Sequence, residues 1–151
     1  SFDSIKIYEN IERQTFARHI PILKSIVNKN GYPTGDKVGV ESASHFFVLV
    51  QHSDIDVKFQ EKMLADIKKQ VDNKQLIGKE YAYLYDRVQI NSGRPQLYGT
   101  QVDYGSDGNA FAKNLKNKAD VNNRRRQLNM ETLEDYLTKV TEMHNKMNKR
   151  N

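Results

Sequence analysis

Apolar residues follow the spacing of amphipathic helices along most of the chain. Ile5, Tyr8 and Ile11 recur at intervals of three residues, and a second apolar stripe begins after Pro21. Proline fits the first turn of a helix, where its missing N–H is not needed. We therefore expect residues 4–29 to form helix with a break near the middle.

The next two segments predict helices of different character. Residues 46–50 are apolar on every side, and the residues before them extend the segment beyond strand length, so we expect a buried helix over residues 39–51. Residues 54–73 carry apolar side chains every three or four positions, as an amphipathic helix does. Ser53 is the expected N-cap of this helix, with Asp56 three residues later as in a capping box.

The C-terminal half combines helices with a hairpin. Residues 96–103 alternate loosely, a turn-rich stretch follows, and residues 110–115 supply a second strand. Helices are expected around the hairpin, at residues 79–90, 121–128 and 131–149. The pattern predicts a single, mainly α (α+β) domain over residues 1–151, a bundle of about six helices with one small β-hairpin near residues 96–115.

Composition narrows the class of protein. The chain of 151 residues contains no Cys, which excludes disulfides and thiolate metal sites. No apolar run approaches the roughly 20 residues that span a bilayer, so we expect no membrane span. No signal peptide is visible, but the chain begins with Ser1 rather than Met. The compartment is left open between the cytoplasm and export after removal of an upstream segment.

The net charge of +5 comes from the C-terminal quarter of the chain. Residues 113–151 hold 10 Lys/Arg and 5 Asp/Glu, whereas the two signs cancel over residues 1–112. Such a segment is compatible with an anionic partner or with a solvated helix face. Single-strand nucleic-acid binders interleave aromatic and basic residues. Because this segment has few aromatics, nucleic acid ranks last among the expected partners.

Polar residues gather where the buried helix of residues 39–51 ends. Gln51, His52 and Asp54 directly follow its apolar run, and His is the side chain best suited to proton transfer near neutral pH. Asp54 is placed either to orient His52 or to stabilise the N-terminus of the next helix. Gln60 lies beside the apolar stripe of that helix, so we expect its amide to have designated partners. Solvation at the edge of the stripe is the alternative.

A second polar group follows in the C-terminal half. Asp86 is spaced to face the core of its helix, with Arg87 turned toward another side, and a structural ion pair or cap is the alternative to a functional role. Gly99 marks a bulge or a close approach in the expected strand. An inward-facing Arg125 is placed to hold an anion or pair with an acid. The strand itself adds Gln96, Tyr98, Thr100 and Gln101.

These residues define the expected site. The best catalytic candidates are His52, Asp54 and Asp86. His45 and His52 share a helix face, but their spacing matches no metal motif, so we expect neither a metal nor a cofactor. The expected ligand-binding residues are Gln51, His52, Gln60, Asp86, Arg87, Gln96, Tyr98, Thr100, Gln101 and Arg125.

The order of these motifs resembles that of an uncharacterised bacterial family known only as a domain of unknown function. The likeness covers roughly residues 15–137. It implies no established reaction. Tyr32, Asn122 and Asn129 depart from the family pattern, where Trp, an acid and Gly are usual. The motifs that carry it are Gln51-His52-x-Asp54, Phe59-Gln60, Asp86-Arg87, Gln96-x-Tyr98-Gly99-Thr100-Gln101 and Arg124-Arg125.

Three functions are open on this sequence. The first is a binding domain with a neutral-polar pocket for a small ligand or a peptide. In the second, a small hydrolase or transferase, His52 acts as the base and Asp54 or Asp86 orients it. Arg87 or Arg125 would then hold an anionic substrate. The third is a protein-interaction or immunity-type module whose polar cluster is purely structural.

Overall fold

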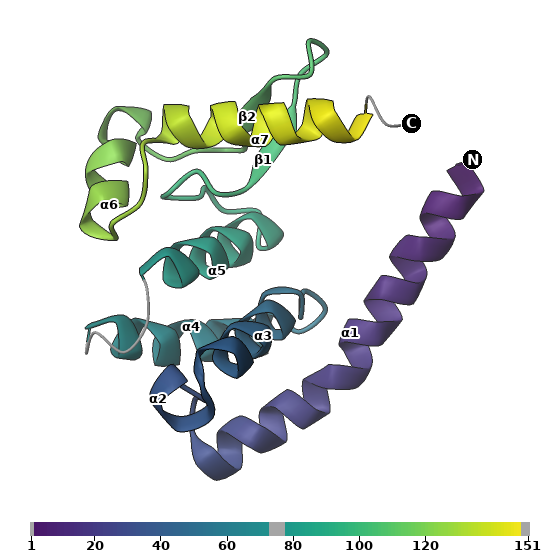
Figure 1. Ribbon diagram of the computed structural model, residues 1–151, viewed down its shortest axis with the longest axis vertical. Helices are drawn as coiled ribbons and strands as arrows, with labels where there is room; N and C mark the ends of the chain where they lie inside the picture. The colour runs from purple at the N-terminus through teal and green to yellow at the C-terminus, as the bar shows by residue number, and fades with distance from the viewer. Residues whose placement is uncertain (1, 73–77, 149–151) are drawn as a thin grey trace. The chain divides into compact units, whose positions relative to one another are not determined.

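The computed structural model describes residues 2–72 and 78–148, and their side chains from residue 6 onward. The chain divides into two compact units, Ser1–Leu76 and Ile77–Asn151, here called unit 1 and unit 2. The fold is mainly α with one two-stranded hairpin, which confirms the predicted class (Figure 1). Among the described helices, none is long and apolar enough to cross a membrane.

The described part of unit 1 contains four helices, and the three longer ones each bury an apolar stripe. Helix α3 (Val40–Gln51) lies at the centre of the unit, because it contacts each of the other three helices. Its apolar sequence suits this position. Its buried side chains include Phe46 and Val50, which confirms the helix predicted for residues 39–51. The four elements are α1 (Phe2–Asn30), α2 (Gly35–Val38), α3 (Val40–Gln51) and α4 (Val57–Asp72).

Helix α1 continues through Pro21, so the predicted break near its middle is wrong. A proline inside a helix removes one hydrogen bond and costs about 3 kcal/mol. Ile20, Leu23 and Val27 are nevertheless buried on both sides of this position. Burial of one continuous stripe outweighs the local cost, and the exposed ring of Pro21 meets no packing constraint.

The N-cap of α4 also differs from the prediction. The Phe59 N–H donates to Asp56 Oδ1 at 3.0 Å, so Asp56 is the capping residue. The hydroxyl of Ser53 instead donates to the Leu49 carbonyl at 2.8 Å. Asp56 directly precedes the first helical residue, Val57, which is the position from which a carboxylate reaches the free N–H groups.

Unit 2 places a hairpin and three α-helices around a small core. The strands are antiparallel, with Asp103 opposite Phe111. Helix α7 contacts both β2 and α6, and Thr132 caps it by accepting the Asp135 N–H at 3.2 Å. The core is formed by Val121, Leu133 and Tyr136. The elements are α5 (Gly78–Asn91), β1 (Val102–Tyr104), β2 (Ala110–Ala112), η1 (Lys118–Asp120), α6 (Val121–Gln127) and α7 (Leu133–Asn148).

The hairpin is shorter than the sequence predicts. Gln96 forms an isolated bridge with Leu115, but residues 97–101 are turns and bends rather than strand. The expected alternation of side chains across a strand is therefore wrong for this stretch. Gly99 has φ of 73°, a left-handed conformation that breaks a strand. We call residues 97–101 the clamped loop, because side chains hold it from both sides.

Candidate functional site

A buried carboxylate binds the N–H groups of the clamped loop. Asp86 on α5 is fully buried, as its spacing predicts. Its Oδ1 accepts the Leu97 N–H at 2.9 Å and its Oδ2 accepts the Thr100 N–H at 2.9 Å. The Tyr98 N–H lies 3.1 and 3.2 Å from the two oxygens, and the Thr100 hydroxyl donates to Oδ2 at 3.0 Å. Both oxygens of Asp86 are thus occupied by groups of its own chain.

Three other side chains bind the carbonyl oxygens of the same loop. Two are arginines of α6, and the third is a tyrosine of α7. One of the arginines is itself almost fully buried, and its Nε donates to the carbonyl of Glu131, just before α7. The donor–acceptor pairs are Arg124 Nε to Leu97 O at 2.8 Å, Arg125 Nη1 to Tyr98 O at 2.6 Å, and Tyr136 Oη to Thr100 O at 2.9 Å.

Gln96 closes the loop at its base. Its Oε1 accepts the Gln101 N–H at 3.0 Å, and its Nε2 donates to the Gln101 carbonyl at 2.7 Å. The same nitrogen donates to the Lys113 carbonyl on the other arm of the hairpin. One amide therefore satisfies both backbone groups of Gln101 and fixes where the loop begins and ends.

The loop also packs too closely to accept a side chain at its centre. A Cβ atom added to Gly99 would lie 2.7 Å from Leu133 Cδ1, well inside van der Waals contact. Leu133 is buried at the start of α7. Glycine is thus required at this position both for its positive φ and for the close approach of α7.

Burial dominates the electrostatics of these groups. It raises the pKa of the Asp86 carboxyl, although hydrogen bonds from Thr100, Leu97 and Tyr98 oppose the shift. Burial likewise lowers the pKa of Arg125, and it raises the pKa of Tyr98 to about 12. Only an ionised carboxylate can accept every donor around Asp86, and the convergent hydrogen bonds offset part of its desolvation.

Three tyrosines meet beside the clamped loop. Tyr81 and Tyr85 stand one turn apart on α5, with ring centroids 5.8 Å apart. The ring of Tyr98 lies edge-on to both, at 6.3 Å from Tyr81 and 5.9 Å from Tyr85. All three side chains are half-buried. We call these residues the tyrosine cluster, and its third member is placed by the loop clamp.

In unit 1, Gln60 is a fully buried polar residue, as predicted from its place on α4. Its Nε2 lies 3.2 Å from the Val50 carbonyl, 3.0 Å from the Gln51 carbonyl and 3.1 Å from Asp54 Oδ1. These are groups at and after the C-terminus of α3. Its Oε1 is buried without a hydrogen-bond partner among the described residues. The amide thus caps the end of α3, which confirms that it has designated partners.

His52 directly follows α3 and is half-buried. Its ring stacks on Phe16 of α1, with centroids 4.8 Å apart and planes 14° apart. One face of the imidazole is therefore covered by an apolar ring, which holds its orientation within unit 1.

The structure therefore divides the predicted site residues between the two units. Unit 1 holds Gln51, His52, Asp54 and Gln60. Unit 2 brings the others together around the clamped loop, apart from Arg87, which follows Asp86 on α5 and is half-buried. The sequence reasoning missed Tyr136, because its spacing from Leu133 marks it only as part of the apolar stripe of α7. It also missed the role of Arg124, which stood within a run of three arginines.

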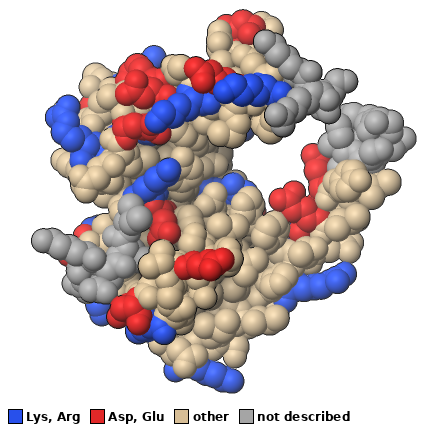
Figure 2. All heavy atoms as spheres, in the orientation of Figure 1, with Lys and Arg blue, Asp and Glu red and all other residues tan. Residues whose placement is uncertain are grey.

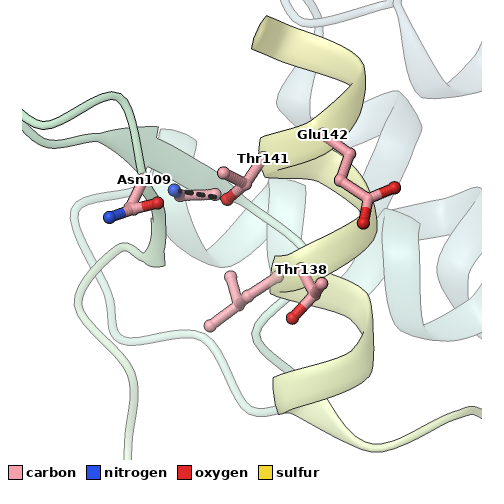
Figure 3. A pocket seen from close by; sticks show the side chains of 6 residues that line it. Asn109, Thr138, Thr141 and Glu142 are labelled. Carbon is pink, nitrogen blue, oxygen red and sulfur yellow. Dashed lines mark hydrogen bonds between the residues drawn. The ribbon is translucent and has the colours of Figure 1, made fainter.

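Among the described residues, pockets also lie outside these clusters, one in each unit. The pocket drawn in Figure 3 opens between the hairpin and α7, with a volume of about 280 Å³. Thr141 faces the hairpin there and accepts the Ala110 N–H at 2.9 Å. The second, in unit 1, is described below. Within the described residues, no group of three or more His, Asp or Glu could hold a metal ion.

The surface charge of α7 is mixed. In the face shown in Figure 2, Lys and Arg atoms form a band along this helix, and Asp and Glu atoms lie beside them. The positive excess of the C-terminal segment is therefore interleaved with acids there, which favours a solvated helix face.

Comparison with known proteins finds a family and nothing more specific. No curated protein and no solved structure matches the chain. A family model described as a family of unknown function, DUF6624, matches residues 10–148. That range includes both polar clusters and nearly all of both units. The chain belongs to this family of unknown function, as the order of its motifs suggested.

Proposed function

We propose that this protein is a non-catalytic binding module for a small neutral ligand or a peptide. The recognition surface would be the tyrosine cluster with the half-buried side chain of Gln101. The observation that carries the proposal is the saturation of the clamped loop. Side chains engage the N–H groups of Leu97, Tyr98 and Thr100 and the carbonyls of the same three residues.

A loop fixed in this way is preorganised for binding. Ordering a flexible loop at an interface costs conformational entropy that is subtracted from the affinity. Here that cost is met during folding, by side chains that are buried and contribute nothing to a surface, such as Asp86 and Arg125. The clamp therefore explains the polar cluster of unit 2 without assigning it any chemistry.

Tyrosines suit a recognition surface of this kind. A tyrosine presents a large amphipathic ring at a low cost in side-chain entropy, and its hydroxyl finds polar partners. The raised pKa of Tyr98 keeps its hydroxyl protonated at neutral pH. The cluster therefore offers neutral donors and apolar ring edges, which match sugars and peptides better than charged ligands.

The catalytic alternative has less support. A general base must come within hydrogen-bond reach of its substrate, and Asp86 is fully buried with both oxygens occupied. Asp54 Oδ1 accepts from Gln60, and His52 has one ring face against Phe16. These contacts favour structural roles for the three residues predicted as catalytic candidates.

The proposal is tested by an NMR screen of the full chain against neutral sugars and short peptides, comparing wild type with Tyr98→Ala. The substitution removes the ring but keeps the backbone groups that the clamp binds. Tyr8→Ala is the matched control, because Tyr8 is exposed on α1 in unit 1. We expect saturable shifts at the tyrosine cluster that Tyr98→Ala abolishes and Tyr8→Ala preserves. Shifts centred elsewhere, or binding that survives Tyr98→Ala, would overturn the proposal.

A further inference from the structure

A pocket in unit 1 gathers lysines from two helices. It has a volume of about 290 Å³ and lies where α1 faces the start of α4. Each helix contributes two polar side chains one turn apart, which places them on one face of that helix. Its walls are Lys24 and Asn28 of α1, the capping residue Asp56, and Lys58, Phe59 and Lys62 of α4.

The single carboxylate of the pocket is already fully engaged. Asp56 Oδ1 accepts the Phe59 N–H at 3.0 Å, and its Oδ2 accepts from Lys24 Nζ at 2.5 Å. The hydrogen bond from Lys24 is the largest cause of the lowered pKa of Asp56, which is therefore ionised at neutral pH. It offsets one of the three lysine charges, and the lining carries a formal charge of +2.

Neither of the other two lysines forms a hydrogen bond or ion pair with an acid among the described residues, and Lys58 has only a Coulombic interaction with Asp56. Lys62 Nζ donates to the neutral side-chain oxygen of Asn28 at 3.0 Å. Lys58 has no hydrogen bond or ion pair among the described residues. It also lies in the first turn of α4, where the helix dipole disfavours a cation and where this helix has no acid. Helix stability therefore does not explain why these cations surround a cavity.

We propose that this pocket binds a phosphate group carried by a small molecule. Lys58 and Lys62 would donate to its oxygens from one wall, and Lys24 would contribute positive charge from the other. Ammonium groups bind phosphate as point charges in strong, charge-assisted hydrogen bonds. The site belongs to unit 1 and is independent of the tyrosine cluster, so either proposal can fail alone.

The test is a titration of the full chain with inorganic phosphate at constant ionic strength, followed by backbone amide NMR. Chloride at the same ionic strength is the reference. We expect saturable shifts confined to residues around Lys24, Asn28 and the first two turns of α4. The double variant Lys58→Gln/Lys62→Gln should raise the dissociation constant for phosphate by on the order of tenfold or more.

Lys68→Gln is the matched control. Lys68 lies on the same helix but outside the pocket, where it pairs with Asp72. Its loss should leave phosphate affinity unchanged. An equal loss of phosphate affinity in this control would overturn the proposal. So would shifts that rise without saturation at lysines throughout the chain, because they would indicate general screening of charge. If the double variant does not fold, Lys58→Gln alone allows the same comparison, since that ammonium has no hydrogen bond or ion pair to lose among the described residues.

Discussion

In each unit, a buried polar side chain hydrogen-bonds backbone groups outside regular secondary structure or at its end. The two side chains have opposite hydrogen-bonding character. In unit 1, an amide of Gln60 donates to carbonyl oxygens at the end of α3. In unit 2, a carboxylate of Asp86 accepts from N–H groups of the clamped loop. Both residues are fully buried on helices, and neither lines the hairpin pocket of unit 2 or the lysine pocket of unit 1.

The difference follows from the backbone groups that each side chain meets. The last turn of a helix leaves carbonyls without partners, and only a donor can satisfy them. A loop that turns through a left-handed glycine points several N–H groups inward, and only an acceptor can satisfy those. The buried Gln60 and Asp86 can therefore be explained by the backbone beside them before any chemistry is assigned.

The largest expected effect comes from Asp86→Ala. Its loss leaves three N–H groups and a hydroxyl without their acceptor in a buried site, and we expect a loss of about 3 to 5 kcal/mol in the free energy of unfolding. Urea denaturation followed by circular dichroism measures it. Asp103→Ala, an exposed acid on β1, is the control and should cost less than about 1 kcal/mol. Similar losses in the two variants would contradict the clamp.

Gln60→Glu should come next, at about 2 to 4 kcal/mol at neutral pH, because it turns a carboxylate toward three acceptor oxygens. Gln60→Met, which removes the amide without adding charge, should cost less, about 1 to 3 kcal/mol. Denaturation at pH 7 and at pH 4 separates the two. Acid should relieve only the Glu variant by protonating it, and equal losses at both pH values would argue against convergent acceptors.

These effects also indicate how far the sequence could be interpreted. The periodicity of α4 placed Gln60 beside a buried stripe, and the position of Asp86 relative to Ala82 turned it inward; both are buried. The partners of Asp86 were not predictable, because the loop that it binds is separated from it by more than ten residues and has no regular structure.

The errors have local causes. The alternation of residues 96–103 suggested a strand, but Gly99 and the clamp turn it into a loop. Ser53 and Asp56 are both good N-cap residues, and only the actual start of α4 at Val57 decides between them. Pro21 suggested a break that packing of the buried stripe overrides. In each case tertiary contacts decided between local preferences of similar strength.

A smaller effect is expected from Tyr136→Phe. This change removes the hydroxyl that donates to the Thr100 carbonyl but keeps the ring over which Arg125 lies. We expect a loss of about 1 kcal/mol, the usual net value of one hydrogen bond. Tyr104→Phe is the control, since that hydroxyl has no hydrogen bond among the described residues. Thermal unfolding of both variants measures the difference, and an unchanged midpoint for Tyr136→Phe would remove this residue from the clamp.

The smallest effect is a contrast in pH dependence between two acids. The hydrogen bond from Lys24 lowers the pKa of Asp56, so its contribution to stability is present above the ordinary value of 3.8 and is lost as pH falls through the folded value. Burial raises the pKa of Asp86, so its contribution is present below 3.8 and declines as pH rises through the folded value. NMR titration of carboxyl carbons should find the two on opposite sides of 3.8. In Lys24→Gln, the pKa of Asp56 should rise. An unchanged pKa of Asp56 in this variant would contradict Lys24 as the cause of its shift.

Amide hydrogen exchange at Leu97, Tyr98 and Thr100 tests the clamp most directly. These residues belong to no helix or strand, and an ordinary loop would exchange rapidly. Because Asp86 accepts their N–H groups, we predict protection comparable to that of the α7 core, and its loss in Asp86→Asn with α7 still protected. Rapid exchange of these amides in the wild-type protein would show that the loop is not held and would contradict the structural role assigned to the polar cluster.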